Sequence, residues 1–149
     1  MACPEIRRLL IVEDEKTLSY FLAQSFLTEP DDYEVVAVGS AEEALEALAE
    51  RERSGGAGRF GVIIADVVLP QLSGLDLLER VRAAGPETRV IVITAYGGEQ
   101  VYNRARALGA FDYVDKPFEF ERLKEAVLRA FDAPGLEGRE QPARGAYTP

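Results

Sequence analysis

The stretch from Val62 to Pro70 constrains this chain most, because an apolar run there ends in a single carboxylate. Residues 62–65 (Val-Ile-Ile-Ala) have the pattern of a strand that is buried on both faces of a parallel sheet. Asp66 follows, and Pro70 rules out further regular strand pairing. Open α/β sheets bind ligands beyond the carboxyl ends of their strands. Asp66 is therefore a candidate functional residue if other polar side chains meet it there.

The rest of the chain alternates between strand and helix patterns. Short apolar runs predict strands at 9–12, 33–38, 62–66, 89–94 and 111–114. Apolar spacing and end signals predict helices at 17–27, 41–52 and 75–83, after Gly97-Gly98 up to 108, and at 118–131. Five successive strand–helix units predict an α/β fold, an open and doubly wound parallel sheet with right-handed crossovers.

Local signals mark helix ends and helix faces. Ser40 and Glu43 form a capping-box pattern, and Gly109 is placed to cap the C-terminus of the fourth helix. Apolar residues at helical spacing in the first helix are Leu18, Phe21 and Leu22, with Ser25 on the same stripe. In the last helix the predicted inward residues are Leu123, Val127 and Ala130.

The length of 149 residues fits one domain, which we expect at residues 1–131, followed by a tail or linker at 132–149 without periodicity. No apolar run has transmembrane length, and the run at 9–12 is too short for a signal peptide. The single cysteine, Cys3, cannot form an internal disulfide, which fits a reducing cytoplasm. We therefore expect a cytoplasmic protein without membrane association.

Composition also excludes several function classes. The net charge of −9 disfavours nucleic-acid binding by this chain, because phosphates would be repelled. The chain has no histidine, which removes Ser-His-Asp and Cys-His catalysis and the commonest zinc ligand. Any chemistry must therefore use carboxylates, hydroxyls and amines.

Polar side chains follow four of the predicted strands: Glu13 and Asp14, Asp66, Thr94 and Lys116. They would gather at one edge of the sheet. Three carboxylates at ~5 Å repel by roughly 3 kcal/mol per pair at an effective dielectric of about 20, so a cation is needed. Oxygen ligands in an open acidic cleft suit Mg²⁺, with Mn²⁺ as the alternative. The set predicts phosphoryl transfer to Asp66, with Lys116 and Thr94 holding the transferred group's oxygens.

Taken together, these residues and their neighbours resemble the receiver domain of two-component response regulators. The resemblance rests on Glu13-Asp14, Asp66-Val-Val-Leu-Pro70 with Gly74, Ile93-Thr94-Ala95, and Tyr113-Val-Asp-Lys116-Pro117-Phe118. It covers about residues 6–131 and implies the flavodoxin-like, CheY-like (βα)5 fold with strand order 2-1-3-4-5. It also implies a phosphohistidine donor on a sensor histidine kinase or a phosphotransfer protein, in agreement with a chain that lacks histidine.

The resemblance assigns a role to each matching residue. Asp66 would be the phosphoacceptor, and the metal would be held by Glu13, Asp14, Asp66 and the backbone carbonyl of Val68. The phosphoryl group would be bound by Thr94, Ala95 and Lys116, and a cis peptide bond would join Lys116 to Pro117. Thr94 and Tyr113 would form the switch, with Tyr113 turning in from solvent on phosphorylation. Val68 and Tyr96 would tune hydrolysis.

The implied protein is a signalling switch and not a turnover enzyme, although it would catalyse its own phosphorylation and slow dephosphorylation. Its output surface would combine the helix around 101–108, strand 111–114 and the last helix, as a partner face or a homodimer face. The sequences at 93–97 and 109–118 are similar to those of receivers of the nitrogen-regulatory (NtrC-like) type. Such receivers usually precede an ATPase domain and a DNA-binding domain. A stand-alone receiver and a fragment of a longer regulator both remain open.

Three other functions are compatible with parts of the sequence. A phosphotransferase of the haloacid-dehalogenase type needs a second Asp two residues after the nucleophile, where this chain has Val68. A flavin- or nucleotide-binding module needs a phosphate-binding turn after the first strand, where Glu13-Asp14-Glu15 would repel phosphate. A pure interaction module would differ from a receiver in a phosphate-transfer test.

Overall fold

The computed structural model describes residues 6–85 and 87–133, so Cys3 and residues 134–149 of the predicted tail lie outside the described part. Five parallel strands form one sheet in the order β2-β1-β3-β4-β5, which confirms the predicted fold and strand order. The strands are β1 (Arg7–Val12), β2 (Tyr33–Val38), β3 (Val62–Asp66), β4 (Arg89–Thr94) and β5 (Asp112–Asp115). β5 begins one residue later than predicted.

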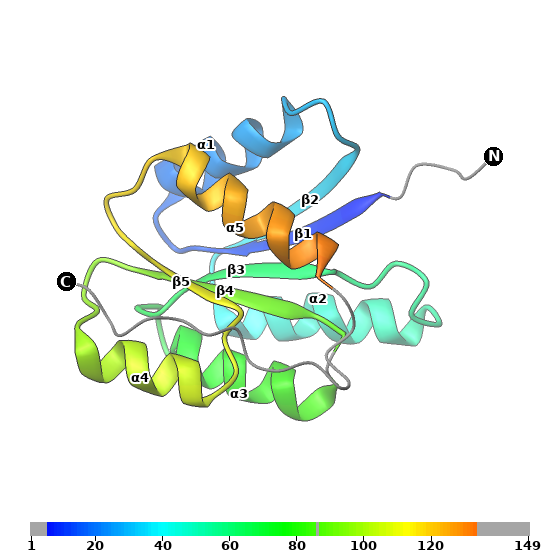
Figure 1. Cartoon of the computed structure of the whole chain (residues 1–149). Helices are drawn as coiled ribbons and strands as arrows, with labels where there is room; N and C mark the ends of the chain where they lie inside the picture. The colour runs from blue at the N-terminus through cyan, green and yellow to red at the C-terminus, as the bar shows by residue number, and fades with distance from the viewer. Residues whose placement is uncertain (1–5, 86, 134–149) are drawn as a thin grey trace.

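Helices cover both faces of the sheet (Figure 1). They are α1 (Lys16–Leu27), α2 (Ala41–Arg53), α3 (Gly74–Ala84), α4 (Glu99–Ala107) and α5 (Phe120–Asp132). α1 and α5 pack on one face, and α2, α3 and α4 on the other. No helix in the described part of the chain is long and apolar enough to cross a membrane.

The central strand β3 is buried along its whole length, as its apolar run predicts. Ile63 and Ala65 face the core under α2 and α3, while Val62 and Ile64 face the core under α1 and α5. Fully burying one Val, Leu or Ile side chain stabilises a fold by about 1.5–3 kcal/mol. A strand that contributes to two cores is therefore firmly held, and Asp66 at its end has a fixed position.

The helix ends follow the predicted signals with small shifts. Ser40 caps α2 by accepting a hydrogen bond from the Glu43 N–H at 3.1 Å. Gly109 follows α4 with a φ of 94°, a left-handed conformation that suits glycine at a helix C-terminus. The predicted start of the last helix at residue 118 is wrong by two residues, because the N-cap Glu119 has an extended backbone.

The residues at helical spacing in α1 differ in their burial. Leu22 is fully buried, but Phe21 is 51% exposed and the second buried residue is Phe26. Phe26 packs against Phe120 of α5 with ring centroids 4.9 Å apart. Phe26 also packs against Tyr33 of β2 with centroids 5.4 Å apart, so it fills the space between α1, the sheet and α5. In α5 itself, the predicted inward residues Leu123, Val127 and Ala130 are all buried.

Candidate phosphoryl-transfer site

Three carboxylates meet at the carboxyl edge of the sheet. Glu13 and Asp14 directly follow β1, and Asp66 ends β3. One oxygen of each carboxylate lies within 4.8 Å of the others, so the set could hold a metal ion. Glu13 and Asp66 are buried, whereas Asp14 is exposed. The sheet topology thus brings together the three residues that the sequence predicts as carboxylate ligands.

Lys116 connects two of these carboxylates. Its Nζ donates to Glu13 Oε1 at 2.7 Å and to Asp66 Oδ2 at 2.5 Å. Burial opposes the charge of Lys116, but its hydrogen bonds to Asp66 and Glu13 outweigh this effect and raise its pKa. Burial also raises the pKa of Glu13, and the Lys116 hydrogen bond offsets this only in part. One lysine faces three carboxylates, so the group carries a formal charge of −2.

Strands β4 and β5 place the remaining predicted residues. The Lys116 N–H donates to the Thr94 carbonyl at 2.9 Å, and the Lys116–Pro117 peptide bond is cis, as predicted. Thr94 is fully buried, and its Oγ1 accepts a hydrogen bond from the Tyr96 N–H at 3.1 Å. Ala95 is exposed and lines a cleft of about 420 Å³ together with Lys116. Thr94, Ala95 and Lys116 therefore lie at the same edge as Asp66.

The loop after β3 is shaped by contacts that involve Asp66 itself. Asp66 Oδ1 accepts a hydrogen bond from the Val68 N–H at 2.9 Å. A Cβ atom on Gly74 would overlap the backbone carbonyl oxygen of Asp66, so only glycine allows α3 to begin this close to the strand. The side chains of Val68 and Tyr96, the predicted hydrolysis-tuning residues, are 51% and 77% exposed.

Two acidic residues near the site have roles that the sequence analysis missed. Glu15 caps α1, because its side chain accepts hydrogen bonds from Thr17 N and Leu18 N at 3.1 and 2.7 Å. These hydrogen bonds lower the pKa of Glu15. Glu42 of α2 accepts a hydrogen bond from Leu72 N of the β3–α3 loop at 3.3 Å. A carboxylate directly before a helix signals the cap, whereas no local signal reveals the Glu42 contact.

Tyr113, the predicted switch residue, has its side chain turned inward. The sequence analysis expects its side chain to turn in from solvent on phosphorylation, and in the structure its hydroxyl oxygen is buried. The Tyr113 ring packs edge-on against Tyr102 of α4, with centroids 5.4 Å apart and an interplanar angle of 82°. The Tyr113 side chain therefore lies inward and contacts α4.

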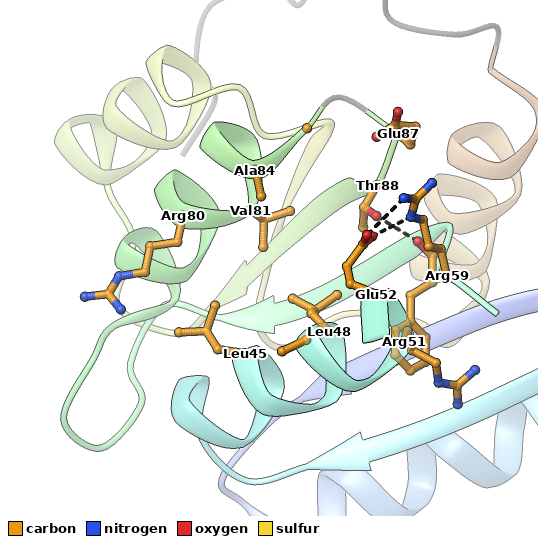
Figure 2. A pocket seen from close by; sticks show the side chains of 13 residues that line it. Leu45, Leu48, Arg51, Glu52, Arg59, Arg80, Val81, Ala84, Glu87 and Thr88 are labelled. Carbon is orange, nitrogen blue, oxygen red and sulfur yellow. Dashed lines mark hydrogen bonds and ion pairs between the residues drawn. The ribbon is translucent and has the colours of Figure 1, made fainter. Parts of the chain in front are cut away.

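A second cleft, of about 250 Å³, lies between α2 and α3 (Figure 2). Its lining includes Phe60, just before β3, and Thr88, just before β4, so it lies at the opposite end of these strands from Asp66. Within it, Arg59 pairs with Glu52 through contacts of 2.5 and 3.0 Å. None of the predicted site residues lines this cleft.

Comparison with known proteins identifies the family. Residues 9–128 match the response regulator receiver domain family. The chain is 37% identical over 122 residues to response regulator protein FleR of Pseudomonas aeruginosa, covering 82% of this chain and 24% of FleR. It is 30% identical over 125 residues to the DNA-binding transcriptional regulator NtrC of Azospirillum brasilense, covering 84% of this chain and 24% of NtrC. This chain thus spans about a quarter of the length of these relatives.

Solved structures agree with the family match. A response regulator receiver domain protein from Clostridium thermocellum has a TM-score of 0.70 at 31% identity, with 83% of this chain and 93% of that chain covered. A response regulator protein from Burkholderia pseudomallei, solved with a phosphorylated aspartic acid, a calcium ion and citrate, has a TM-score of 0.70 at 26% identity, with 83% and 68% covered.

The family match covers most of the folded chain, and the relatives include NtrC, in line with the resemblance predicted from the sequence. The order of the strands and the acidic edge of the sheet agree with it. The chain therefore belongs to the receiver domains of two-component response regulators, which are signalling proteins.

Proposed function

We propose that Asp66 accepts a phosphoryl group from a phosphohistidine on a sensor histidine kinase or a phosphotransfer protein. One Asp66 carboxylate oxygen attacks phosphorus, the P–N bond breaks, and its electron pair stays on the imidazole nitrogen. The observation that carries the proposal is the Lys116 ammonium bonded to both Asp66 and Glu13 in a group of net negative charge. The phosphorylated aspartic acid of the Burkholderia pseudomallei structure supports it.

The acidic group fits Mg²⁺ or Mn²⁺, because its donors are carboxylate oxygens within 4.8 Å of one another and one of them is exposed to solvent. We propose that Glu13, Asp14, Asp66 and the backbone carbonyl of Val68 hold the ion. When bound, the ion supplies positive charge for the phosphoryl oxygens. The calcium ion of the Burkholderia pseudomallei structure is in keeping with such a site.

The other residues of the edge would act on the transferred group. Phosphoryl transfer depends mainly on positioning and charge stabilisation. Lys116 would exchange its bond to Asp66 for one to a phosphoryl oxygen, while Thr94 and the backbone of Ala95 would bind the remaining oxygens. The chain would in this way catalyse its own phosphorylation and slow dephosphorylation without being a turnover enzyme.

We propose that the output surface is formed by α4, β5 and α5. A phosphoryl group on Asp66 would draw in the Thr94 hydroxyl, and the neighbouring Tyr113 ring would pass the change to Tyr102 of α4. This surface would bind an output partner or a second copy of the chain. The net charge of −9 disfavours direct contact with nucleic acid.

Intact-mass spectrometry tests the acceptor. With Mg²⁺ and acetyl phosphate, the wild type should gain one phosphoryl group and Asp66→Asn none. Asp76→Asn is the matched control, because Asp76 is exposed in the first turn of the next helix and should leave phosphorylation unchanged. Undiminished phosphorylation of Asp66→Asn would contradict the assignment of Asp66 as the phosphoacceptor.

A second proposal concerns the lifetime of the phosphorylated state. Hydrolysis needs a water molecule held in line with the bond between Asp66 and phosphorus. Val68 cannot hydrogen-bond a water, and Tyr96 is bulky, so we expect slow loss of phosphate. Val68→Asn combined with Tyr96→Glu should lose phosphate faster, whereas the control Tyr20→Glu, another exposed tyrosine, should not. If the double variant decays no faster than wild type, water access at these positions does not set the lifetime.

A further inference from the structure

A glycine beside the proposed switch lies where a side chain would meet Tyr113. A Cβ atom on Gly97 would overlap the Tyr113 hydroxyl and would lie 3.1 Å from both Tyr113 Cζ and Thr94 Cγ2. Contacts of 3.1 Å are tighter than nearly all real Cβ contacts, and an overlap with the hydroxyl requires Tyr113 to move. The Tyr113 hydroxyl thus occupies the space that any other residue at position 97 would fill.

Space, and not backbone conformation, is what makes position 97 a glycine site. Among the described residues, the glycines with positive φ are Gly55, Gly56, Gly98 and Gly109, and Gly97 is not one of them. The φ of Gly97 therefore lies outside the left-handed region that favours glycine. The neighbouring Gly98 shows the reverse: its φ is 98°, but a Cβ atom there would meet nothing within 4 Å.

We propose that Gly97 is a positioning residue, whose missing side chain creates the place that holds the Tyr113 hydroxyl inward against Thr94. The buried hydroxyl of Tyr113 is in keeping with this role. Because the Tyr113 ring also packs on Tyr102, Gly97 sets where α4 contacts the switch. This last step rests on the proposed function, whereas the position of the ring does not.

NMR of the unphosphorylated protein, with labelled threonine methyl groups and tyrosine rings, tests the position of the ring. Wild type should show a nuclear Overhauser effect between the Thr94 methyl group and the Tyr113 ring. Gly97→Ala should lose it. The proposal is overturned if wild type lacks this signal or if Gly97→Ala keeps it.

Gly98→Ala is the matched control for strain and partial unfolding. It adds the same methyl group one residue later, where the positive φ strains it but no atom blocks it. Its melting temperature should fall, yet the signal between Thr94 and Tyr113 should persist. Loss of the signal in both variants would mean that loop strain, and not the space at Gly97, positions the ring.

A rescue variant tests which atom is in conflict. Combining Gly97→Ala with Tyr113→Phe removes the overlapping hydroxyl and leaves the 3.1 Å contact with ring Cζ, which a small shift relieves. The signal between the Thr94 methyl group and the ring should return. If the double variant also lacks this nuclear Overhauser effect, the hydroxyl is not the group that Gly97 accommodates.

Acetyl phosphate then separates this inference from the proposed function. Gly97→Ala should still gain a phosphoryl group on Asp66, but the phosphorylation-induced shifts at Tyr102 and along β5 should be lost. Wild-type shifts in Gly97→Ala would overturn the role of Gly97 in the switch. If the wild type itself gains no phosphoryl group, the proposed function fails while the result on the ring position still stands.

Discussion

The two edges formed by the strand ends of the sheet carry buried carboxylates in opposite electrostatic situations. Asp112 begins β5 at one edge and is 5% exposed, and Asp66, which ends β3 at the other edge, is also 5% exposed. Asp112 accepts hydrogen bonds from Arg122 at 3.3 Å and Arg129 at 3.1 Å, both from α5. Asp66 shares the single Lys116 with Glu13 and lies within 4.8 Å of Asp14. One carboxylate thus faces two cations, whereas three carboxylates face one cation.

This difference separates a structural ion pair from a functional site. A buried charge costs several kcal/mol unless partners compensate it. The Asp112 cluster is compensated within the domain and so needs no ligand. The Asp66 group keeps a formal charge of −2, which stability alone would not favour. Ionisable groups with perturbed pKa values, such as Glu13 in this group, cluster at functional sites. The comparison predicts different responses to mutation and to Mg²⁺.

The largest effect is expected for Lys116→Met in metal-free protein at neutral pH. Two buried carboxylates lose their ion pair, and removing one partner of such a pair costs about 3 kcal/mol. Urea unfolding should show this loss, and saturating Mg²⁺ should recover part of it. Lys124→Met is the control, because Lys124 pairs with Glu29 and Glu121 nearer the surface, and should change stability far less. Equal losses in the free energy of unfolding of the two variants would contradict the proposed excess of negative charge around Lys116.

A smaller effect is expected for Asp112→Asn. Arg122 and Arg129 are 41% and 45% exposed, so water can solvate them when the carboxylate charge is gone. The loss of charged hydrogen bonds should lower the free energy of unfolding by about 1–2 kcal/mol. Urea unfolding with and without Mg²⁺ should give the same loss. A loss that Mg²⁺ reduces would show that the Asp112 cluster is not independent of the acidic edge.

The smallest effect, and the only one with the opposite sign, is expected for Asp14→Asn. Removing one of three repelling carboxylates should stabilise the metal-free protein, but by less than about 1 kcal/mol because Asp14 is exposed and its charge is screened. The rise in melting temperature that Mg²⁺ gives the wild type should shrink in the variant. A metal-free melting temperature below that of wild type would argue against repulsion at this edge.

The amino-acid sequence by itself determined the succession of five strand–helix units and the polar residues that lie at one edge of the sheet, and its resemblance to receiver domains supplied the strand order. Apolar runs of strand length, joined by helical segments, lead to five parallel strands, and parallel strands bring their carboxyl ends to one edge. Glu13 and Lys116 therefore meet although they are 103 residues apart. Short-range signals were also sufficient for the cap of α2 and for the buried face of α5.

Only the tertiary structure decided which buried charges are compensated and which space the Tyr113 side chain occupies. The two arginines of Asp112 come from α5, and Leu72 of the β3–α3 loop donates to Glu42 of α2. The Tyr113 hydroxyl lies where a Cβ atom on residue 97 would be, and Phe26 of α1 packs against Phe120 of α5. Each of these contacts joins separate elements. Side-chain periodicity fixes the face on which a residue lies, whereas packing between elements fixes its neighbour.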